Sequence, residues 1–540
     1  MEQKRDLVYW GAGSIGSLCL EMYPDIRPKF FIDSNWESGM FYDLPVKKPD
    51  NIVCWKELNI VITTTAYNEI EKILISKDLK KNENYIMYLD FFSIEKTSVE
   101  ESIYSCLYYT EKKDSHTILI RSSMFAARTW KDMIKFFHCY GIKRLPQKSI
   151  LFSSGAVVDE NHAEEILGYP VFNVPDICKW EGHMDVDMDF NKNPLIHGDL
   201  LLKEEKEWIW KLEERKLQDD KTFSFHVTSE IYWYYKQVIS ILEPSQIIIW
   251  GGWTRESYIL AELAKRNNIP YGFMEFGWIP GTYQFDRRGI AGQSEYAVNS
   301  DSILKRPVEY KSKEIKEIRD YIVRNKIDTG KFRKNGEDER ALARINQQKK
   351  TVFFVGMGDS SMGINPESDY WKQYVSSFFS STQEAVSFVA EICRRNEWNF
   401  VFKPHPSPAN KDGLAQDKLG DTIIQVKYTE IDRLIELSDV VISIASAVNY
   451  KVLIYGKPLV QLGHTTLSQK GCCYEIQSID EIEAQLRNAL ENGMTEVQNE
   501  NFEFHMEQLL ENYLWDDLSD RALRYGLSLE TDFFSECNRR

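Results

Sequence analysis

A lysine and a histidine stand at the end of an apolar run late in the sequence. The run NFVF is followed by Lys403, Pro404, His405 and Pro406. Proline fixes φ and cannot donate a ladder hydrogen bond, so a strand here must end and present the lysine and the histidine. Because open α/β sheets bind ligands at the carboxyl ends of their strands, we expect Lys403 and His405 to contact a ligand.

A small-residue loop follows the apolar run TVFFV. It includes Gly356, Gly358, Asp359 and Ser360. Such loops expose backbone N–H groups to an anion, and Asp359 adds a carboxylate at the same strand end. We expect Asp359, like His405, to lie at a cleft and outside the core.

A third strand end carries hydroxyl and amide groups. The run DVVI leads into Ser443, followed by Ser446 and Asn449 before the Gly-Lys-Pro of residues 456–458. In a parallel sheet the carboxyl ends of the strands lie at one edge. The three groups are therefore expected to converge.

The middle of the chain holds a loop rich in glycine, proline and charge, MEFGWIPGTYQFDRRGIAGQS (274–294). Loops of this composition often form binding sites. Glu275 ends a predicted strand, and a carboxylate in a partly apolar cleft can have its pKa raised toward neutrality. Glu275 is therefore a candidate acid, base or hydroxyl-binding group. Asp286 and Arg287 are either part of this site or a solvated ion cluster.

The N-terminal segment carries a glycine fingerprint. Gly11, Gly13 and Gly16 follow a predicted strand, and Asp33 ends the next one. Glycines let the backbone approach a pyrophosphate, and the acid can hold a ribose hydroxyl. NAD(P) or another nucleotide could bind here, or the domain could serve only as a scaffold. No Tyr-x-x-x-Lys pair follows, so we assign no hydride transfer.

Strand and helix signals alternate along most of the chain, which predicts an α/β protein with parallel sheets. A chain of 540 residues exceeds one core. We expect three Rossmann-like domains: a nucleotide-binding domain (1–113), a second domain (114–335), and a third (336–540) with C-terminal helices. The charged stretch from 305 to 350 is expected to be exposed helix and linker. The region after 478 should be mainly helical.

Composition excludes several classes of function. The sequence has 66 Lys and Arg against 82 Asp and Glu, a net charge of -16, which disfavours nucleic-acid binding. Its nine cysteines form no CxxC pair, so neither a zinc site nor a disulfide framework is indicated. No apolar run is long enough to span a membrane, and no signal peptide is evident. We therefore expect a cytoplasmic protein without a metal.

Five features together resemble the bacterial capsular polysaccharide biosynthesis glycosyltransferases, a family that includes the β-Kdo transferases. They are E-x-G-x-x-P-G-T (275–282), D-x-x-G (286–289), a strand followed by the small-residue loop with Asp359, K-P-H-P (403–406) and S-x-x-S-x-x-N-Y-x-x-L-x-Y-G-K-P (443–458). The resemblance spans residues 115–500. It implies a GT-B architecture, in which two Rossmann-like domains face each other across a cleft.

The resemblance also implies roles for the candidate residues. His405, with Lys403, would contact the phosphate or sugar of a nucleotide-sugar donor, and the helix N-terminus at Ser446 would neutralise the nucleotide without a metal. Glu275 would be the acceptor-side carboxylate. Asp359 would be a nucleophile that forms a glycosyl-enzyme intermediate. The other donor-side positions are Gly358, Ser360, Ser443, Asn449 and Lys451, and the other acceptor-side positions are Asp286 and Arg287.

One position departs from the family pattern. Family members often carry a donor-contacting Glu five residues before the GKP glycine, whereas this chain has Lys451. The donor therefore stays open. The expected partners are a nucleotide sugar and a glycan or lipid-linked glycan acceptor, met at the inner face of the membrane beside polysaccharide assembly machinery. Three alternatives remain: a polyol-phosphate transferase, a nucleotide-sugar epimerase, and a non-catalytic sugar-nucleotide-binding scaffold.

Overall fold

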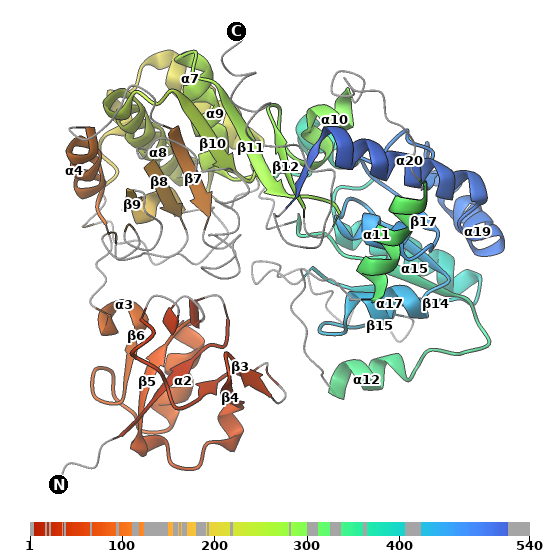
Figure 1. Cartoon of the computed structure of the whole chain (residues 1–540), viewed down its shortest axis with the longest axis horizontal. Helices are drawn as coiled ribbons and strands as arrows, with labels where there is room; N and C mark the ends of the chain where they lie inside the picture. The colour runs from red at the N-terminus through yellow and green to blue at the C-terminus, as the bar shows by residue number, and fades with distance from the viewer. Residues whose placement is uncertain are drawn as a thin grey trace. The chain divides into compact units, whose positions relative to one another are not determined.

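The structure of the protein is a computed structural model (Figure 1). It describes residues 5–13, 15–16, 19–20, 23–34, 36, 39–64, 67–92, 97–110, 118–123, 150–154, 160, 164, 170–179, 191, 194–216, 220–279, 282–299, 312–324, 336–359, 364–405 and 423–516. The chain divides into two compact units. The first comprises residues 1–179, 188–194 and 237–246, and the second comprises 180–187, 195–236 and 247–540.

The first unit begins with a six-stranded sheet in the order β3-β4-β2-β1-β5-β6, parallel except for the β3–β4 pair. Alternate side chains of β1 enter different apolar clusters, Val8 one and Tyr9 the other, so both faces are covered, as in parallel sheets. The elements are β1 (Asp6–Trp10), β2 (Phe31–Ile32), β3 (Met40–Phe41), β4 (Leu44–Lys47), β5 (Leu58–Ile62), α2 (Tyr67–Ser76), β6 (Tyr85–Met87) and α3 (Tyr88–Phe91).

The same unit contains three further parallel strands in the order β7-β8-β9. Helix α4 (Val99–Thr110) is bonded to the last of them. Tyr109 Oη donates to the Val171 carbonyl at 3.2 Å, and Ser102 Oγ donates to the Asn173 carbonyl at 2.9 Å. The strands are β7 (Ile118–Ser123), β8 (Ile150–Ser154) and β9 (Val171–Asn173).

The second unit contains the strand run β10-β11-β12, with β10 and β11 parallel and β12 antiparallel to β11. A buried ion pair between Arg255 Nε and Glu213 Oε1, 3.0 Å apart, joins α9 to α7. The elements are α7 (Lys203–Glu214), α8 (Lys221–Leu242), β10 (Gln246–Trp250), α9 (Arg255–Arg266), β11 (Tyr271–Phe276), β12 (Thr282–Asp286) and α10 (Glu295–Val298); residues 237–242 of α8 and Gln246 of β10 belong to the first unit.

A second six-stranded sheet, here called the C-terminal sheet, has the order β15-β14-β13-β16-β17-β18 and is parallel throughout. Phe353 and Phe354 enter the apolar clusters on opposite faces. The α/β prediction with parallel sheets is therefore confirmed. The elements are β13 (Thr351–Val355), α14 (Asp369–Tyr374), α15 (Thr382–Arg395), β14 (Asn399–Lys403), β15 (Ile423–Gln425), α17 (Ile431–Leu437), β16 (Val440–Ser443), α18 (Val448–Ile454), β17 (Leu459–Gln461), β18 (Tyr474–Glu475), α19 (Ile482–Asn492) and α20 (Glu496–Asn512).

The charged stretch between 305 and 350 is not simply an exposed linker, and that expectation was wrong for its two helices. Helix α11 (Ser312–Arg324) packs against α20 (Figure 1) and buries Ile315 and Ile322 in the apolar cluster. In α12 (Gly336–Leu342) the buried Asp338 accepts hydrogen bonds from the Thr429 N–H and hydroxyl. Among its many charged residues, α11 has apolar residues at helical spacing, and these form its buried face.

The C-terminal region is helical as predicted, but α20 is followed by a short strand, β19 (Leu514–Asp516). This strand pairs antiparallel with β12, where Tyr283 is the partner of Trp515. The end of the described chain thus returns to a strand much earlier in the sequence. Among the residues described, no helix has the length and apolarity to cross a bilayer.

Candidate functional site

The candidate site lies at one edge of the C-terminal sheet. Strands β14, β13, β16 and β17 are neighbours and run parallel, so the residues that follow them meet at the same edge. The three predicted strand-end groups come after β13, β14 and β16. Their placement on adjacent parallel strands is confirmed.

The loop after β13 touches the lysine–histidine segment directly. The Gly356 N–H donates to the Lys403 carbonyl at 2.9 Å. A Cβ atom on Gly356 would lie 2.7 Å from that carbonyl oxygen and 2.9 Å from Pro404 Cα. Only glycine permits this approach of two backbones. The following residues, Met357 and Gly358, are buried.

Asp359 is buried, so the expectation that it lies outside the core was wrong. Its two carboxylate oxygens accept from Thr382, one from the backbone N–H at 2.5 Å and the other from the hydroxyl at 2.6 Å. Thr382 is the first residue of α15. Asp359 therefore satisfies an otherwise unbonded N–H of that helix. Ser360, the next predicted donor contact, lies outside the described residues.

The ammonium group of Lys403 and the imidazole of His405 belong to the segment at the end of β14, at the same edge of the sheet. Lys403 Nζ donates to the Lys427 carbonyl at 2.8 Å. His405 has an exposed side chain. Desolvation by the surrounding protein, and then the charge of Lys403, lower the pKa of His405 below its usual value. At neutral pH His405 is therefore an uncharged imidazole that can donate or accept a hydrogen bond.

The polar groups after β16 form an internal pair. Ser443 Oγ donates to Asn449 Oδ1 at 2.6 Å, and both residues are fully buried. Asn449 Nδ2 is buried and has no hydrogen-bond partner among the residues described. Ser446 is partly exposed, and its hydroxyl accepts from the Val448 N–H at 3.2 Å.

Lys451 points into the protein. It is 6% exposed, and its Nζ lies 2.7 Å from Asp432 Oδ2 on α17. Asp432 also accepts a hydrogen bond from Tyr455 Oη. The lysine that departs from the family pattern therefore ion-pairs with a carboxylate of the same fold, and this pair links α18 to α17.

Glu275 supplies a carboxylate near the end of β11. It is partly buried, and its Oε1 accepts from the Phe276 N–H at 3.0 Å. No cationic side chain pairs with it among the residues described. Burial therefore raises the pKa of Glu275 to about 7. Gly251, at the end of β10, leaves space beside it, because a Cβ there would lie 3.8 Å from Glu275 Oε2.

Asp286 organises the loop that follows β12. Its carboxylate accepts from the N–H groups of Arg288 at 2.7 Å, Gly289 at 3.2 Å and Glu295 at 2.8 Å, and from Tyr513 Oη at 2.8 Å. The carboxylate is buried. Arg287, by contrast, is exposed. Of the two predicted acceptor-side residues, Asp286 is thus part of the loop's internal structure and Arg287 faces solvent.

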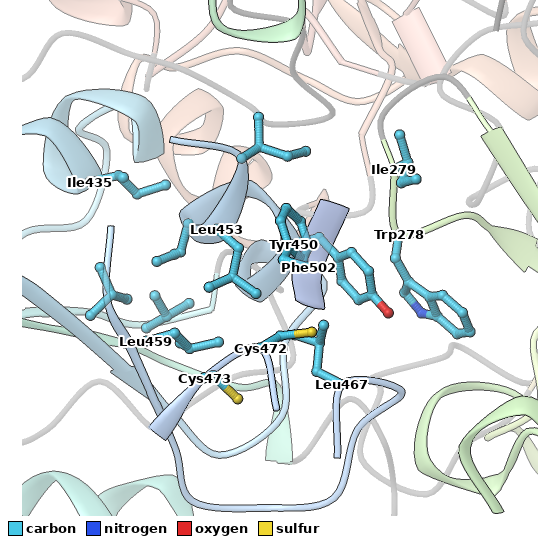
Figure 2. Packing of buried hydrophobic residues seen from close by; sticks show 14 of the residues in the cluster. Trp278, Ile279, Ile435, Tyr450, Leu453, Leu459, Leu467, Cys472, Cys473 and Phe502 are labelled. Carbon is cyan, nitrogen blue, oxygen red and sulfur yellow. The ribbon is translucent and has the colours of Figure 1, made fainter. Parts of the chain in front are cut away.

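A stack of aromatic rings joins the β11 loop to α18. The Trp278 indole stacks with Tyr450, with ring centroids 5.6 Å and planes 15° apart, and with Tyr513, at 5.4 Å and 8°. Figure 2 shows the Tyr450 ring pointing toward Trp278. Trp278 and Tyr450 belong to the same buried cluster as Leu453 and Phe502. The segment that follows Glu275 is therefore packed against the helix that carries Asn449.

Sequence reasoning missed a fourth strand end, at β17, where His464 follows. His464 Nε2 lies 3.0 Å from Ser377 Oγ, and burial lowers the pKa of His464 below its usual value. The β12–α10 loop reaches the same place, since a Cβ on Gly292 would lie 3.0 Å from the His464 carbonyl oxygen. The histidine after the apolar run KPLVQL was the available signal.

The N-terminal glycine loop has its predicted strand context. Gly11 has φ +126°, and a Cβ on Gly16 would lie 2.3 Å from the Gly11 carbonyl oxygen, so both glycines are required by packing. Apart from Gly13 and its chain neighbours, no atom of the described residues lies within 4 Å of the place where a Cβ on Gly13 would be. Asp33 Oδ2 accepts from the Ala12 N–H at 3.1 Å. A phosphate could therefore approach the backbone at Gly13, whereas Asp33 supports the loop.

No group of three or more metal-binding side chains was found among the residues described. The candidate groups are therefore Lys403, His405 and His464 at the ends of strands of the C-terminal sheet, and the carboxylate of Glu275 near the end of β11. These groups can bind an anion and take up a proton.

Comparison with known proteins gave no family. No family model matches the sequence, and no curated protein matches it. Several solved structures are similar at low identity. KpsC of Thermosulfurimonas dismutans, a β-Kdo 2,7 transferase, is 17% identical, with 54% of this chain and 85% of that chain covered and a TM-score of 0.28.

Two other enzymes cover more of the chain. UDP-GlcNAc 2-epimerase of Methanocaldococcus jannaschii is 12% identical, with 73% of this chain and 99% of that chain covered and a TM-score of 0.33. The spinosyn rhamnosyltransferase SpnG, in complex with thymidine diphosphate, is 7% identical, with coverages of 73% and 96% and a TM-score of 0.33. Similarity at this level assigns neither a family nor a reaction.

Proposed function

We propose that this protein is a GT-B glycosyltransferase that moves a sugar from a nucleotide-sugar donor to a surface polysaccharide. In this proposal the domain 336–540 binds the donor and the domain 114–335 binds the acceptor. The observation that carries the proposal is the meeting of three groups within the second unit. A glycine loop and the Lys403–His405 segment share one sheet edge, and the loop that follows Glu275 packs against a helix of the same edge.

The donor would be held at the edge of the C-terminal sheet. The loop at Gly358 and Ser360 and the cation of Lys403 suit the negative charge of a diphosphate or monophosphate. His405 can donate a hydrogen bond to a phosphate or sugar oxygen while neutral. Ser446 is the accessible member of the Ser443–Asn449 group and would contact the nucleotide, whereas Ser443 and Asn449 support it from below.

Glu275 would act as the general base. A carboxylate with a pKa of about 7 is close to the best value for accepting a proton at neutral pH. It would take the proton of an acceptor hydroxyl while that oxygen bonds to the anomeric carbon and the carbon–phosphate oxygen bond breaks. Arg287 would then contact the acceptor from solvent, and Asp286 would hold the loop that carries it.

Two of the residues predicted from the sequence receive supporting roles in this proposal. Asp359 has both oxygens bonded to Thr382, which favours a role in fixing the loop at Gly358 over that of a nucleophile. Lys451 is bonded to Asp432, which favours a structural role over donor contact. No metal takes part in the proposed transfer.

The finer assignment is a role in capsule or related polysaccharide synthesis in the cytoplasm, at the inner face of the membrane. The acceptor would be a growing glycan or its lipid-linked form. The N-terminal domain (1–113) would bind a nucleotide at Gly13, either NAD(P) or a sugar nucleotide. These assignments rest on the motif resemblance and on the space that the described residues leave at Gly13.

The test is a donor screen with purified protein. UDP-, dTDP-, GDP-, CDP- and CMP-sugars are supplied with and without a glycan acceptor, and nucleotide release and sugar transfer are both measured. We expect one donor to be consumed only when acceptor is present, and His405→Ala to abolish this. Isomerised donor without acceptor would identify an epimerase, consumption of a CDP-polyol a polyol-phosphate transferase, and binding without turnover a scaffold.

A further inference from the structure

The structure assigns Trp278 a role that no sequence motif indicates. We propose that Trp278 is a positioning residue that holds the Glu275 carboxylate in a fixed place relative to α18. The catalytic consequence rests on the proposed function, in which Glu275 is the base and the α18 side of the site binds the donor. The effect of Trp278 on the position of Glu275 does not depend on that function.

The backbone on either side of Trp278 is bonded to Thr282, the first residue of β12. The Gly277 N–H donates to the Thr282 carbonyl at 2.8 Å, and Thr282 Oγ1 donates to the Ile279 carbonyl at 2.7 Å. A Cβ on Gly277 would lie 2.0 Å from Thr282 Oγ1, so Gly277 is held close to the start of β12. Gly277 stands between Glu275 and Trp278 in the chain, and we infer that a displacement of Trp278 disturbs this contact and with it the position of Glu275.

The other end of the link is equally fixed. Tyr450 Oη is bonded to Thr466 Oγ1 and to His505 Nε2, each at 2.8 Å. Tyr450 follows Asn449 on α18, and both are buried. The ring against which Trp278 stacks is therefore held by two hydrogen bonds and cannot follow the indole if the indole moves.

The third ring closes the stack. Tyr513 Oη donates to Asp286 Oδ2 at 2.8 Å, and Asp286 in turn bonds three N–H groups of the loop after β12. Trp278, which is 7% exposed, thus stacks with two phenol rings whose hydroxyl groups are both anchored. This stack is one of the contacts between the segment after β11 and the elements of the C-terminal sheet.

The test compares three variants of the full chain. Trp278→Leu removes the ring, and Trp278→Phe keeps a smaller one. Phe502→Leu is the matched control. Phe502 belongs to the same buried cluster, and its ring lies 6.2 Å from the Tyr450 ring in a tilted contact, but it has no ring contact with Trp278 among the described residues.

The first readout does not require activity. Glutamates are labelled with ¹³C in the carboxyl group, and the Glu275 signal is identified by its loss in Glu275→Gln. In Trp278→Leu we expect the titration midpoint of Glu275 to fall by about one pH unit or more, because the carboxylate gains water. Trp278→Phe should recover most of the wild-type midpoint, and Phe502→Leu should keep it. An unchanged midpoint in a folded Trp278→Leu protein would overturn the inference.

The second readout uses transfer. Trp278→Leu should lower kcat about tenfold to a hundredfold with little change in either KM, since a displacement of about 1 Å can have that effect. Phe502→Leu should lose thermal stability but keep kcat within about twofold of the wild type. If the midpoint shifts and no donor is consumed even by the wild type, the positioning role holds and the proposed function fails.

Discussion

Lys451 Nζ lies 2.7 Å from Asp432 Oδ2, and both side chains are almost wholly buried, at 8% and 1% exposure. The pair links α18 to α17. At this position the sequence departs from the family that its motifs resemble. The lysine is therefore matched by a carboxylate elsewhere in this chain.

Removing one member of this pair should be costly. Lys451→Ala leaves the Asp432 carboxylate buried without its cation, and we expect a loss of about 3–5 kcal/mol in the free energy of unfolding. Arg394→Ala is the control, because its pair with Glu391 is exposed and should contribute little to stability. Denaturant unfolding at neutral pH measures both. A loss of similar size in the two variants would contradict the buried pair.

The pH dependence of transfer should follow Glu275. As a base it must be ionised, and its pKa is about 7, so kcat/KM should rise with pH up to about that value. Glu275→Gln should lower kcat and remove this dependence. If kcat/KM of the wild type does not change between about pH 5 and about pH 8, a range that brackets this pKa, the carboxylate is not the base.

The same carboxylate should weaken the fold at high pH. Its pKa in the folded protein is raised above the ordinary value of 4.5, so the folded state binds more protons between that value and about 7. The stabilisation is complete below the ordinary pKa and is lost as pH rises through the folded one. Glu275→Gln should therefore gain stability over the wild type as pH rises, by an upper limit of about 3 kcal/mol, given about 1.4 kcal/mol per pH unit.

Asp359 and Thr382 should behave as one structural unit. Asp359→Ala removes both acceptors at the start of α15, and we expect a loss of about 1–2 kcal/mol of stability together with lower activity. Thr382→Val removes only the hydroxyl contact and should have a smaller effect on both. Mass spectrometry of the protein with its donor should find no sugar attached to Asp359. A sugar covalently attached to Asp359 would instead show that this residue is the nucleophile.

Acid should destabilise the protein through His505. This buried imidazole bonds Tyr296 Oη at 3.0 Å and Tyr450 Oη at 2.8 Å, and burial, then the charge of Lys470, lower its pKa to about 3. Its contribution to stability is present above the ordinary pKa of 6.5 and is lost as pH falls toward 3. In His505→Phe the slope of stability against pH over this range should be smaller. Thermal melts in the two proteins, compared at matched pH, measure it.

Local sequence patterns were enough for the parallel sheets and the strand-end groups. The end of an apolar strand can be predicted where proline or glycine follows it. In a parallel sheet the carboxyl ends of the strands lie at one edge. Lys403, His405 and Glu275 were found in this way. His464 carried the same signal after β17 and was missed because its neighbours form no motif.

Long-range partners could not be read from the sequence. The pattern of α11 contains an apolar stripe, but nothing local says that α20 covers it. The three residues of β19 have no strand signal of their own and become a strand only by pairing with β12. Asp359 looked like an exposed loop acid because its partner, Thr382, lies beyond a separate segment of chain.

The sequence by itself determined which residues are chemically able to bind an anion or take a proton and which strand each follows, because backbone preference and apolar periodicity act over a few residues. Only the tertiary structure decided which of these groups already have partners. It pairs Lys451 with Asp432, bonds Asp359 to Thr382, and leaves Glu275 without a cation among the described residues, where burial can raise its pKa. Burial and pairing depend on contacts between distant segments, and these form only when the chain folds.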